Sequence, residues 1–189
     1  MTVVFKQVSS DEPIVNAYHE FISPLDTFVK DTVNDKFLQA KINTCGPAVL
    51  AYILTFFGKE IDEESVVSKV KMTEQGTSML ELKKAAIAYD FDAQGVKASY
   101  GALLQEPLPV IAYINDSHYV VVNDVTMSSV YVFDPAIGHV KLSRQSFERA
   151  WKGYLLLVRM RKIKPSMDEV TVADMNVPVD YLGHNPASY

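Results

Sequence analysis

Cys45 is the only cysteine of the 189-residue chain, and its position is one that suits a reactive thiol. It directly precedes Gly46-Pro47 and an apolar run over 49–57 that ends at Gly58. Proline suits the first turn of a helix and glycine suits its end, so the pattern predicts a buried helix over about 46–57 with Cys45 at its N-terminus. The free N–H groups and the dipole there stabilise a thiolate, the nucleophilic form of cysteine. The competing interpretation of a lone cysteine is a small buried hydrophobic residue.

A cysteine nucleophile needs a general base, and the sequence offers four histidines. We expect His118 to be the base, because it opens a β-branched apolar run directly after the polar 115–117 segment. The first residue of a strand is held rigidly and lies at the edge of the sheet, where a cleft can form. The alternative for such a histidine is a hydrogen-bonded strand end. His139 competes with it from the next short strand, and His19 and His184 fall in segments expected to be solvated.

A base works best when a third group fixes its tautomer and stabilises the imidazolium. Asp134 follows His118 by sixteen residues and ends the strand expected to pair with that of His118 in a hairpin. Asp124 lies six residues along the same strand as His118, which puts it about 20 Å away at ~3.3 Å per residue. Asp134 is therefore the predicted partner, although an Asp-Pro pair also suits an ordinary turn. Gln39, six residues before Cys45, could donate a side-chain N–H to an oxyanion.

The composition describes one ordinary globular domain with appendages. Hydrophobic residues make up 48% and charged residues 22% of the chain, and the net charge of −5 argues against nucleic-acid binding. No apolar run approaches the ~20 residues that span a bilayer. The N-terminus lacks a signal-peptide pattern, so we expect a cytoplasmic protein, or a periplasmic or secreted one if a signal has been removed. No histidine and carboxylate spacing such as H-E-x-x-H predicts a metal site, and no cofactor is expected.

The periodicity changes from helical to strand-like near residue 90, which indicates an α+β fold. Residues 1–35 are expected to form a helical lead-in, with one helix capped by Ser10 or Asp11 and another beginning at Ser23-Pro24 and carrying Leu25, Phe28 and Val29. Further helices are expected over 46–57, 60–70, 78–89 (with a Ser78/Glu81 capping box) and 143–151. Strands are expected over 91–97, 109–114, 118–125, 129–133, near Val140 and over 154–160. Residues 161–189 are expected to form a polar tail.

The order of these motifs resembles peptidase family C39, the double-glycine leader peptidases. The motifs are Gln39, Cys45-Gly46-Pro47-Ala48, Gly76-Thr77-Ser78, His118-Tyr119-Val120-Val121, Asp134-Pro135-Ala136-Ile137-Gly138 and Phe147 to Trp151-Lys152-Gly153. These are papain-like cysteine proteases, best known as N-terminal domains of peptide-exporting ABC transporters. The resemblance covers about 36–160, the predicted peptidase domain, and implies a helical half packed on an antiparallel sheet. It also implies that Cys45 is the nucleophile, His118 the base, Asp134 its orienting group and Gln39 part of the oxyanion hole.

The resemblance further implies a substrate class. Relatives cut leader peptides after Gly-Gly or Gly-Ala, so the expected activity is cleavage after small residues through a thioester. The chain departs from the transporter pattern in its longer lead-in, in Thr44 where an acidic residue is common, and in having no transmembrane or nucleotide-binding segment after residue 160. We therefore expect a stand-alone peptidase whose partner is a peptide or protein substrate, and possibly a separate exporter. The alternatives are a peptide-binding module with little turnover, and acyl transfer or isopeptide chemistry by the same residues.

Overall fold

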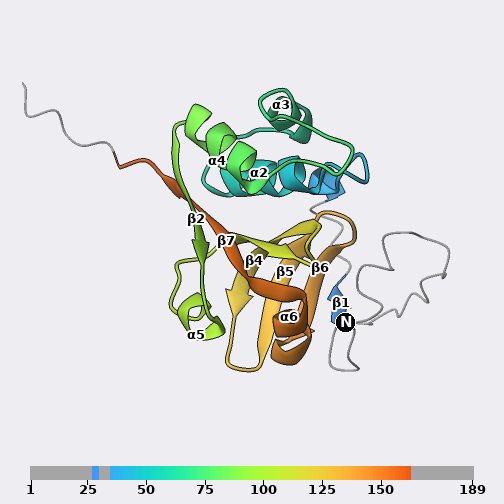
Figure 1. The fold of residues 1–189 in the computed structure, drawn as a ribbon, viewed down its shortest axis with the longest axis vertical. Helices are drawn as coiled ribbons and strands as arrows, with labels where there is room; N and C mark the ends of the chain where they lie inside the picture. Colours follow the sequence, from blue (N-terminus) through green and yellow to red (C-terminus); the bar gives the residue numbers. More distant parts are fainter. Residues whose placement is uncertain (1–26, 30–34, 163–189) are drawn as a thin grey trace, which may run out of the picture.

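A layer of helices packs on an antiparallel sheet, which confirms the expected α+β class (Figure 1). The computed structural model describes residues 27–29 and 35–162. Its helices are η1 (Asp35–Phe37, 3-10), α2 (Cys45–Phe56), α3 (Glu63–Val67), α4 (Met79–Ala88), α5 (Tyr100–Leu103) and α6 (Arg144–Ala150). Its strands are β1 (Thr27–Val29), β2 (Phe91–Lys97), β3 (Val110–Ile114), β4 (His118–Val125), β5 (Ser129–Asp134), β6 (Gly138–Ser143) and β7 (Trp151–Met160). Across these ranges no helix has the length and hydrophobicity to traverse a lipid bilayer.

Helix α2 is buried along most of its length, as its continuous apolar sequence predicts. It begins at Cys45 itself and ends at Phe56. Gly58 then turns the chain with a φ of +87°, a left-handed conformation that glycine adopts without steric cost. The helix that carries the only cysteine is therefore set deep in the domain, with its first residue at one end of the core.

The next two helices start where polar caps are found. Ser78 accepts a hydrogen bond from the Glu81 N–H at 3.3 Å, as predicted for the start of α4. The Glu81 carboxylate does not complete a capping box with Ser78, because it accepts from the Lys84 ammonium at 2.7 Å. Helix α3 is shorter than the predicted 60–70 segment, since Asp62 caps it by accepting from the Ser65 N–H at 2.8 Å. The helical half is thus fixed by local side-chain caps as well as by burial.

The seven strands form one sheet in the order β1-β6-β5-β4-β3-β7-β2, and every pairing is antiparallel. The predicted hairpin of β4 and β5 is present, with Val121 opposite Phe133. Strand β3 pairs with β4 so that Ile114 lies opposite His118. Because β4 begins at His118 and β5 ends at Asp134, the antiparallel pairing brings both residues to the same end of these two central strands.

The main correction to the sequence prediction concerns Thr27–Val29. The predicted second lead-in helix includes these residues, but they form strand β1 and pair antiparallel with Lys141 to His139 of β6. The helix prediction is therefore wrong here, because pairing with the open edge of β6 overrides the local helical spacing. The other predicted lead-in helix and the tail after residue 162 lie outside the described residues.

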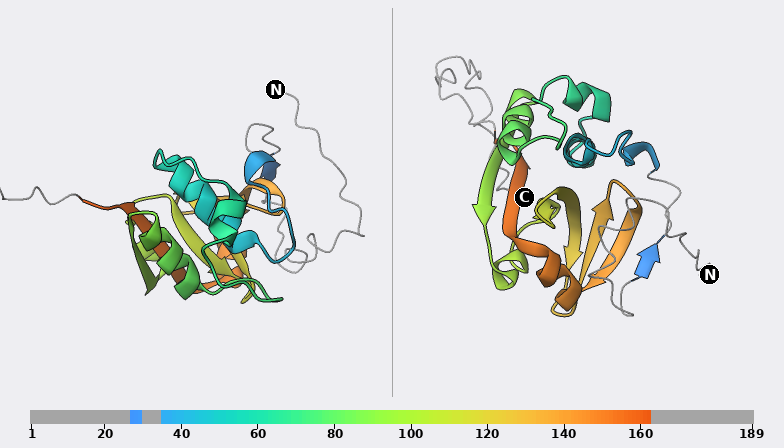
Figure 2. Two further views of the ribbon diagram at one scale, coloured as in Figure 1. Left: turned by 90° about the horizontal axis from the view of Figure 1, so that it is seen from above. Right: turned by 45° about the vertical axis from the view of Figure 1, so that its right-hand side comes forward.

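The sheet is buried on both faces, and alternate residues of each strand serve different cores. One core lies under α2 and α4 and includes Ile111, Val121 and Phe133. The other lies under α5 and α6 and includes Ala112, Val120 and Val132. Figure 1 shows α2, α3 and α4 grouped at the top of the sheet and α5 and α6 at the bottom, and the right-hand view in Figure 2 keeps this separation. The strand ends that carry His118 and Asp134 lie next to the α2, α3 and α4 group, since β4 contacts α2.

Candidate active site

Cys45 is held at the first residue of α2 by close packing around the start of the helix. Its side chain is buried with 6% exposure. A Cβ added at Gly46 would lie 2.7 Å from the Thr77 methyl carbon, so only glycine lets the helix start pack against the 76–78 loop. The Thr44 hydroxyl does not cap the helix and donates instead to the Lys41 carbonyl at 2.8 Å. The first N–H groups of α2 are therefore left for other partners.

His118 and Asp134 form a hydrogen bond where β4 begins and β5 ends. The His118 Nε2 lies 2.9 Å from the Asp134 Oδ1, and the two side chains are 13% and 0% exposed. The same Oδ1 accepts the Ala136 N–H at 2.7 Å. Pro135 has no N–H, so the first backbone donor after Asp134 is Ala136 and it turns back to the carboxylate. Two donors thus fix one carboxylate oxygen toward the imidazole.

The second ring nitrogen of His118 is left for Cys45. Burial by itself would lower the pKa of His118, but the charge of Asp134 and its hydrogen bond outweigh burial. With a further hydrogen bond and charge contribution from Cys45, they raise the pKa of His118 to about 10. Because Nε2 is engaged by Asp134, Nδ1 is the nitrogen that can exchange a proton with the thiol. The arrangement favours the imidazolium form of His118, with Nδ1 as the donor toward the Cys45 sulfur.

Gln39 lies in the loop that leads into α2, and its backbone is tied to the turn after Asp134. Its N–H donates to the Pro135 carbonyl at 2.7 Å. Its side-chain Nε2 donates to the Lys41 carbonyl at 2.8 Å, which fixes the orientation of the amide. The Gln39 Oε1 is buried and has no hydrogen-bond partner. An amide nitrogen carries two hydrogens, so one N–H of Gln39 remains after the bond to Lys41. The structure places Gln39 next to the Asp134 turn, and its role in an oxyanion hole stays a prediction.

The alternatives that the sequence offered for the base and its orienting group make other contacts or lie outside the described residues. The His139 ring packs against the rings of Phe133 and Tyr52, with centroids 5.2 and 6.4 Å away. Asp124 is exposed, and its carboxylate accepts the N–H of its neighbour Val125 at 2.8 Å. His19 and His184 lie outside the described residues. Of the carboxylates and histidines weighed from the sequence, the structure joins His118 with Asp134.

Two tyrosines next to the thiol were not identified from the sequence. Tyr113 and Tyr119 are opposite one another on β3 and β4, and their ring centroids are 4.8 Å apart. Tyr119 is buried, and its hydroxyl donates to the Thr77 carbonyl at 3.3 Å. Burial is the main cause that raises the pKa of each tyrosine, and the charge of Cys45 adds to it in both. Both rings therefore lie within electrostatic reach of Cys45. The sequence analysis predicted the strands of both tyrosines but not the pairing of β3 with β4 that brings them together.

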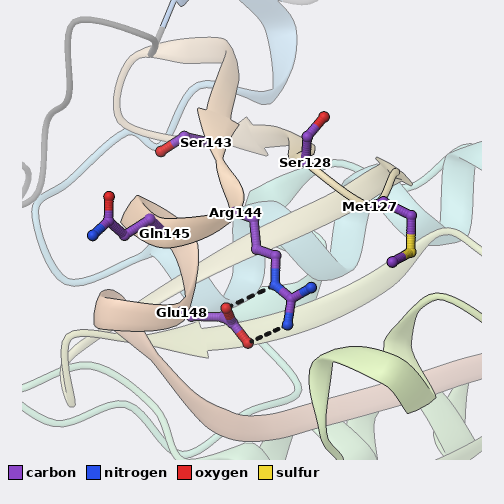
Figure 3. Close-up of a pocket in the computed structure, with 6 residues that line it drawn as sticks. All are labelled: Met127, Ser128, Ser143, Arg144, Gln145 and Glu148. Atoms are coloured by element: carbon purple, nitrogen blue, oxygen red, sulfur yellow. Dashed lines mark hydrogen bonds and ion pairs between the residues drawn. The ribbon is translucent and has the colours of Figure 1, made fainter.

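Two surface hollows lie away from Cys45, His118 and Asp134. One cavity of about 410 Å³ lies beyond the end of β4 that is opposite His118 (Figure 3). It is lined by Met127, Ser128, Ser143, Arg144, Gln145 and Glu148. In the part of the chain that the structure describes, no three His, Cys, Asp or Glu side chains are grouped to hold a metal ion.

Comparisons with known proteins match the same part of the chain. Residues 35–163 match the family model described as Peptidase C39 family. An uncharacterized protein of Methanothermobacter thermautotrophicus is 31% identical over 121 residues, which are 64% of this chain and 85% of that protein. The Lactococcus lactis protein named lactococcin-G-processing and transport ATP-binding protein LagD is 32% identical over 142 residues, 71% of this chain. The match spans only 20% of LagD.

A solved structure agrees with these matches. It is the crystal structure of a double glycine motif protease from an AMS/PCAT transporter, in complex with the leader peptide. Its sequence is 30% identical to this chain, and the TM-score is 0.63. The alignment covers 66% of this chain and 89% of that one. The similarity therefore extends to nearly all of a peptidase domain and to most of the described residues.

Proposed function

The chain belongs to the Peptidase C39 family, and we propose that it cleaves peptide bonds with Cys45 as nucleophile and His118 as base. Its fold is the papain-like α+β fold of this family, with a helical half packed on an antiparallel sheet. The observation that carries the proposal is the buried His118–Asp134 hydrogen bond of 2.9 Å together with the coupling of His118 to Cys45. These contacts support the assignment of Cys45 as nucleophile, His118 as base and Asp134 as orienting group in covalent catalysis.

In the first half of the reaction, the proton shared by Cys45 and His118 lies on Nδ1 of His118, and the Cys45 thiolate attacks the carbonyl carbon. The C–S bond forms while the carbonyl π electrons move to oxygen. The imidazolium then gives its proton to the leaving nitrogen, the C–N bond breaks, and a thioester remains on Cys45. Asp134 holds the imidazole by Nε2 and stabilises its positive charge throughout. A free amino terminus is the first product.

In the second half, water hydrolyses the thioester. His118 takes a proton from water, the hydroxide adds to the thioester carbon, and the C–S bond breaks to give a carboxylic acid and the Cys45 thiolate. In both halves the negative charge on the carbonyl oxygen needs donors. The uncapped N–H groups at the start of α2 and the remaining N–H of Gln39 are the donors that we propose for this charge.

We propose that the residues before the cut are small. Tyr113 and Tyr119 lie within electrostatic reach of the thiol, and Thr77, which accepts a hydrogen bond from Tyr119, packs against Gly46 at the helix start. A bulky side chain before the scissile bond would compete with these groups for space, which costs about 1–3 kcal/mol even when neighbours adjust. The similar transporter protease is named for a double glycine motif and was crystallised with a leader peptide. Its substrate type therefore supports Gly-Gly or Gly-Ala sites here.

A matched peptide set tests the proposal. One peptide carries Gly-Gly before the cut with an amphipathic helical segment upstream, a second has leucine in place of the glycine next to the cut, and a third lacks the upstream segment. Mass spectrometry should show cutting after Gly-Gly in the first peptide and much slower cutting in the other two. Cys45→Ala should cut none of them. Equal cutting of the leucine peptide would contradict the substrate proposal while leaving the chemistry intact.

The same assay distinguishes hydrolysis from the other outcomes. Binding of the first peptide with no product at any time would indicate a peptide-binding module. Transfer of the acyl group to an added amine, seen as a product of matching higher mass, would indicate acyl transfer instead of hydrolysis. Either result would contradict the proposed peptidase activity.

A further inference from the structure

The turn directly before His118 has an unusual backbone. Asn115 and Asp116 have φ values of +51° and +54°, a left-handed conformation that asparagine and aspartate tolerate better than most residues. Ser117 closes the turn by donating its N–H to the Ile114 carbonyl at 3.2 Å. The next residue is His118, the first residue of β4. Any change in this turn is therefore transmitted to the backbone of His118 within two residues.

Three contacts hold the turn from outside. The Asn115 N–H donates to the Ala150 carbonyl at 2.9 Å, where α6 passes into β7. The Tyr113 hydroxyl donates to the Asp116 carbonyl at 2.5 Å. The Lys152 ammonium forms an ion pair with the Asp116 carboxylate, and this partnership raises the pKa of Lys152. The first two contacts hold the backbone, whereas the third joins two side chains that are 61% and 62% exposed.

We propose that the ion pair of Asp116 and Lys152 positions His118 against Cys45, so that both are positioning residues for the reaction. This inference rests on the proposed function, because it assigns the pair a role only if His118 exchanges a proton with Cys45. An exposed ion pair contributes little to global stability. Its position matters here because it fixes a left-handed turn at one end of the strand that bears the base. A catalytic group must be held within about 0.5 Å of its productive position.

The ion pair also links two segments that are far apart in the sequence. Lys152 is next to Trp151, which pairs with Ile114 across β3 and β7. Ile114 in turn pairs with His118 across β3 and β4. The turn, the start of β7 and the start of β4 therefore form one small unit, and the Asp116–Lys152 pair closes it on the solvent side.

The test uses the rate at which iodoacetamide alkylates Cys45, which is the only cysteine of the full chain. The rate depends on the thiolate, and so on the proton exchange with His118, without requiring a substrate. The variants are Asp116→Asn, which preserves the side-chain shape, and Lys152→Met, which preserves its length. At low salt each should alkylate about two- to fivefold more slowly than wild type, the factor expected for loss of an exposed ion pair. The double variant should be no slower than either single variant.

Two controls separate positioning from other effects. Glu148→Gln removes a comparably simple exposed ion pair with Arg144 on α6 (Figure 3), and it should alkylate at the wild-type rate. In about 1 M salt, where screening acts over ~3 Å, the wild-type rate should fall toward that of Asp116→Asn, whose own rate should change less. The unfolding temperatures of all variants should remain close to that of wild type.

The outcomes are distinct. Opposite effects of Asp116→Asn and Lys152→Met would overturn the proposal, because a change in the electrostatic field at Cys45 reverses sign with the charge removed whereas loss of positioning does not. Unchanged rates in both variants would overturn it too, provided that wild-type Cys45 reacts faster than a free thiol and slows in His118→Ala. A wild-type rate equal to that of a free thiol would overturn the proposed function, and this inference with it.

Discussion

Replacement of Asp134 by asparagine isolates the charge of this residue from its geometry. Its Oδ1 accepts two hydrogen bonds, from His118 Nε2 at 2.9 Å and from the Ala136 N–H at 2.7 Å. The Ala136 N–H can only donate, so in Asp134→Asn it should keep the amide oxygen, and not the amide nitrogen, in this place. The imidazole would then still donate from Nε2 and present Nδ1 to Cys45. Asp134→Asn should therefore preserve the tautomer of His118 and remove only the charge.

The size of the effect follows from the pKa of His118. Asp134 is the main cause that raises it from 6.5 to about 10 against the lowering effect of burial. A tenfold change in proton affinity corresponds to about 1.4 kcal/mol, so the net rise corresponds to roughly 5 kcal/mol. A charged hydrogen bond exceeds a neutral one by roughly 1–2 kcal/mol, and the lost charge attraction adds to this difference. We expect kcat/KM at pH 7 to fall by about 10- to 100-fold, without loss of all activity.

The assay is the pH profile of kcat/KM on a cleaved peptide. His118 must be protonated to give a proton to the leaving nitrogen, so the wild-type rate should fall as the pH rises through about 10. In Asp134→Asn this alkaline limb should move by several pH units toward neutrality. Asp124→Asn, on the same strand as His118 but exposed, serves as the matched control and should keep the wild-type profile. An unmoved alkaline limb in Asp134→Asn would refute the argument that Asp134 keeps His118 protonated.

The remaining predictions concern the same site. Cys45→Ala should abolish turnover and lower the free energy of unfolding by about 1 kcal/mol or less, measured by peptide cleavage and urea titration; residual turnover would exclude Cys45 as nucleophile. His118→Ala should be nearly as inactive, whereas His139→Ala should cut at a near wild-type rate, and the reverse order would mean that the base is misassigned. Gln39→Ala should lower kcat by a factor equivalent to ~2.7–4 kcal/mol or somewhat less with KM little changed, and a rise in KM alone would make Gln39 a binding residue. The raised pKa of His118 should stabilise the fold fully below pH 6.5, and this contribution should be lost as the pH rises to about 10; the loss should be smaller in Asp134→Asn.

Much of the fold follows from local signals in the sequence. Strands β2 and β4 have the predicted bounds, because runs such as Val120 to Val122 favour strands and are flanked by turn residues. The predicted cap, Ser78, directly precedes the first residue of α4. Helix α5 was missed because it has only four residues, although Ser99 caps it by accepting from the Ala102 N–H at 3.2 Å. Local signals predict helices and strands of ordinary length, whereas a helix of four residues is too short to show a periodic pattern.

The sites where prediction failed depend on contacts between distant residues. Nothing within Thr27–Val29 predicts its pairing with β6, which is a property of an open sheet edge more than a hundred residues later. The direction of the Gln39 amide is set by the Lys41 carbonyl and by burial of Oε1, neither of which spacing can show. The order of Cys45, His118 and Asp134 indicated which residues meet, because the hairpin of β4 and β5 brings two strand ends together whatever the exact register.

The buried and unpartnered Oε1 of Gln39 bears on how the site is used. A buried polar atom without a hydrogen bond costs about 1–3 kcal/mol, and the amide cannot relieve it by turning over, because the Lys41 carbonyl would then face an oxygen. If peptide binding displaces the groups that cover Oε1, a backbone N–H of the peptide can satisfy it while the remaining N–H of Gln39 faces the carbonyl under attack. Gln39 would then hold the substrate by its oxygen and stabilise the oxyanion by its nitrogen. Gln39→Glu, which keeps the acceptor and removes the donor, should therefore bind peptide better than Gln39→Ala yet turn it over no faster. Equal binding by the two variants would contradict the dual role.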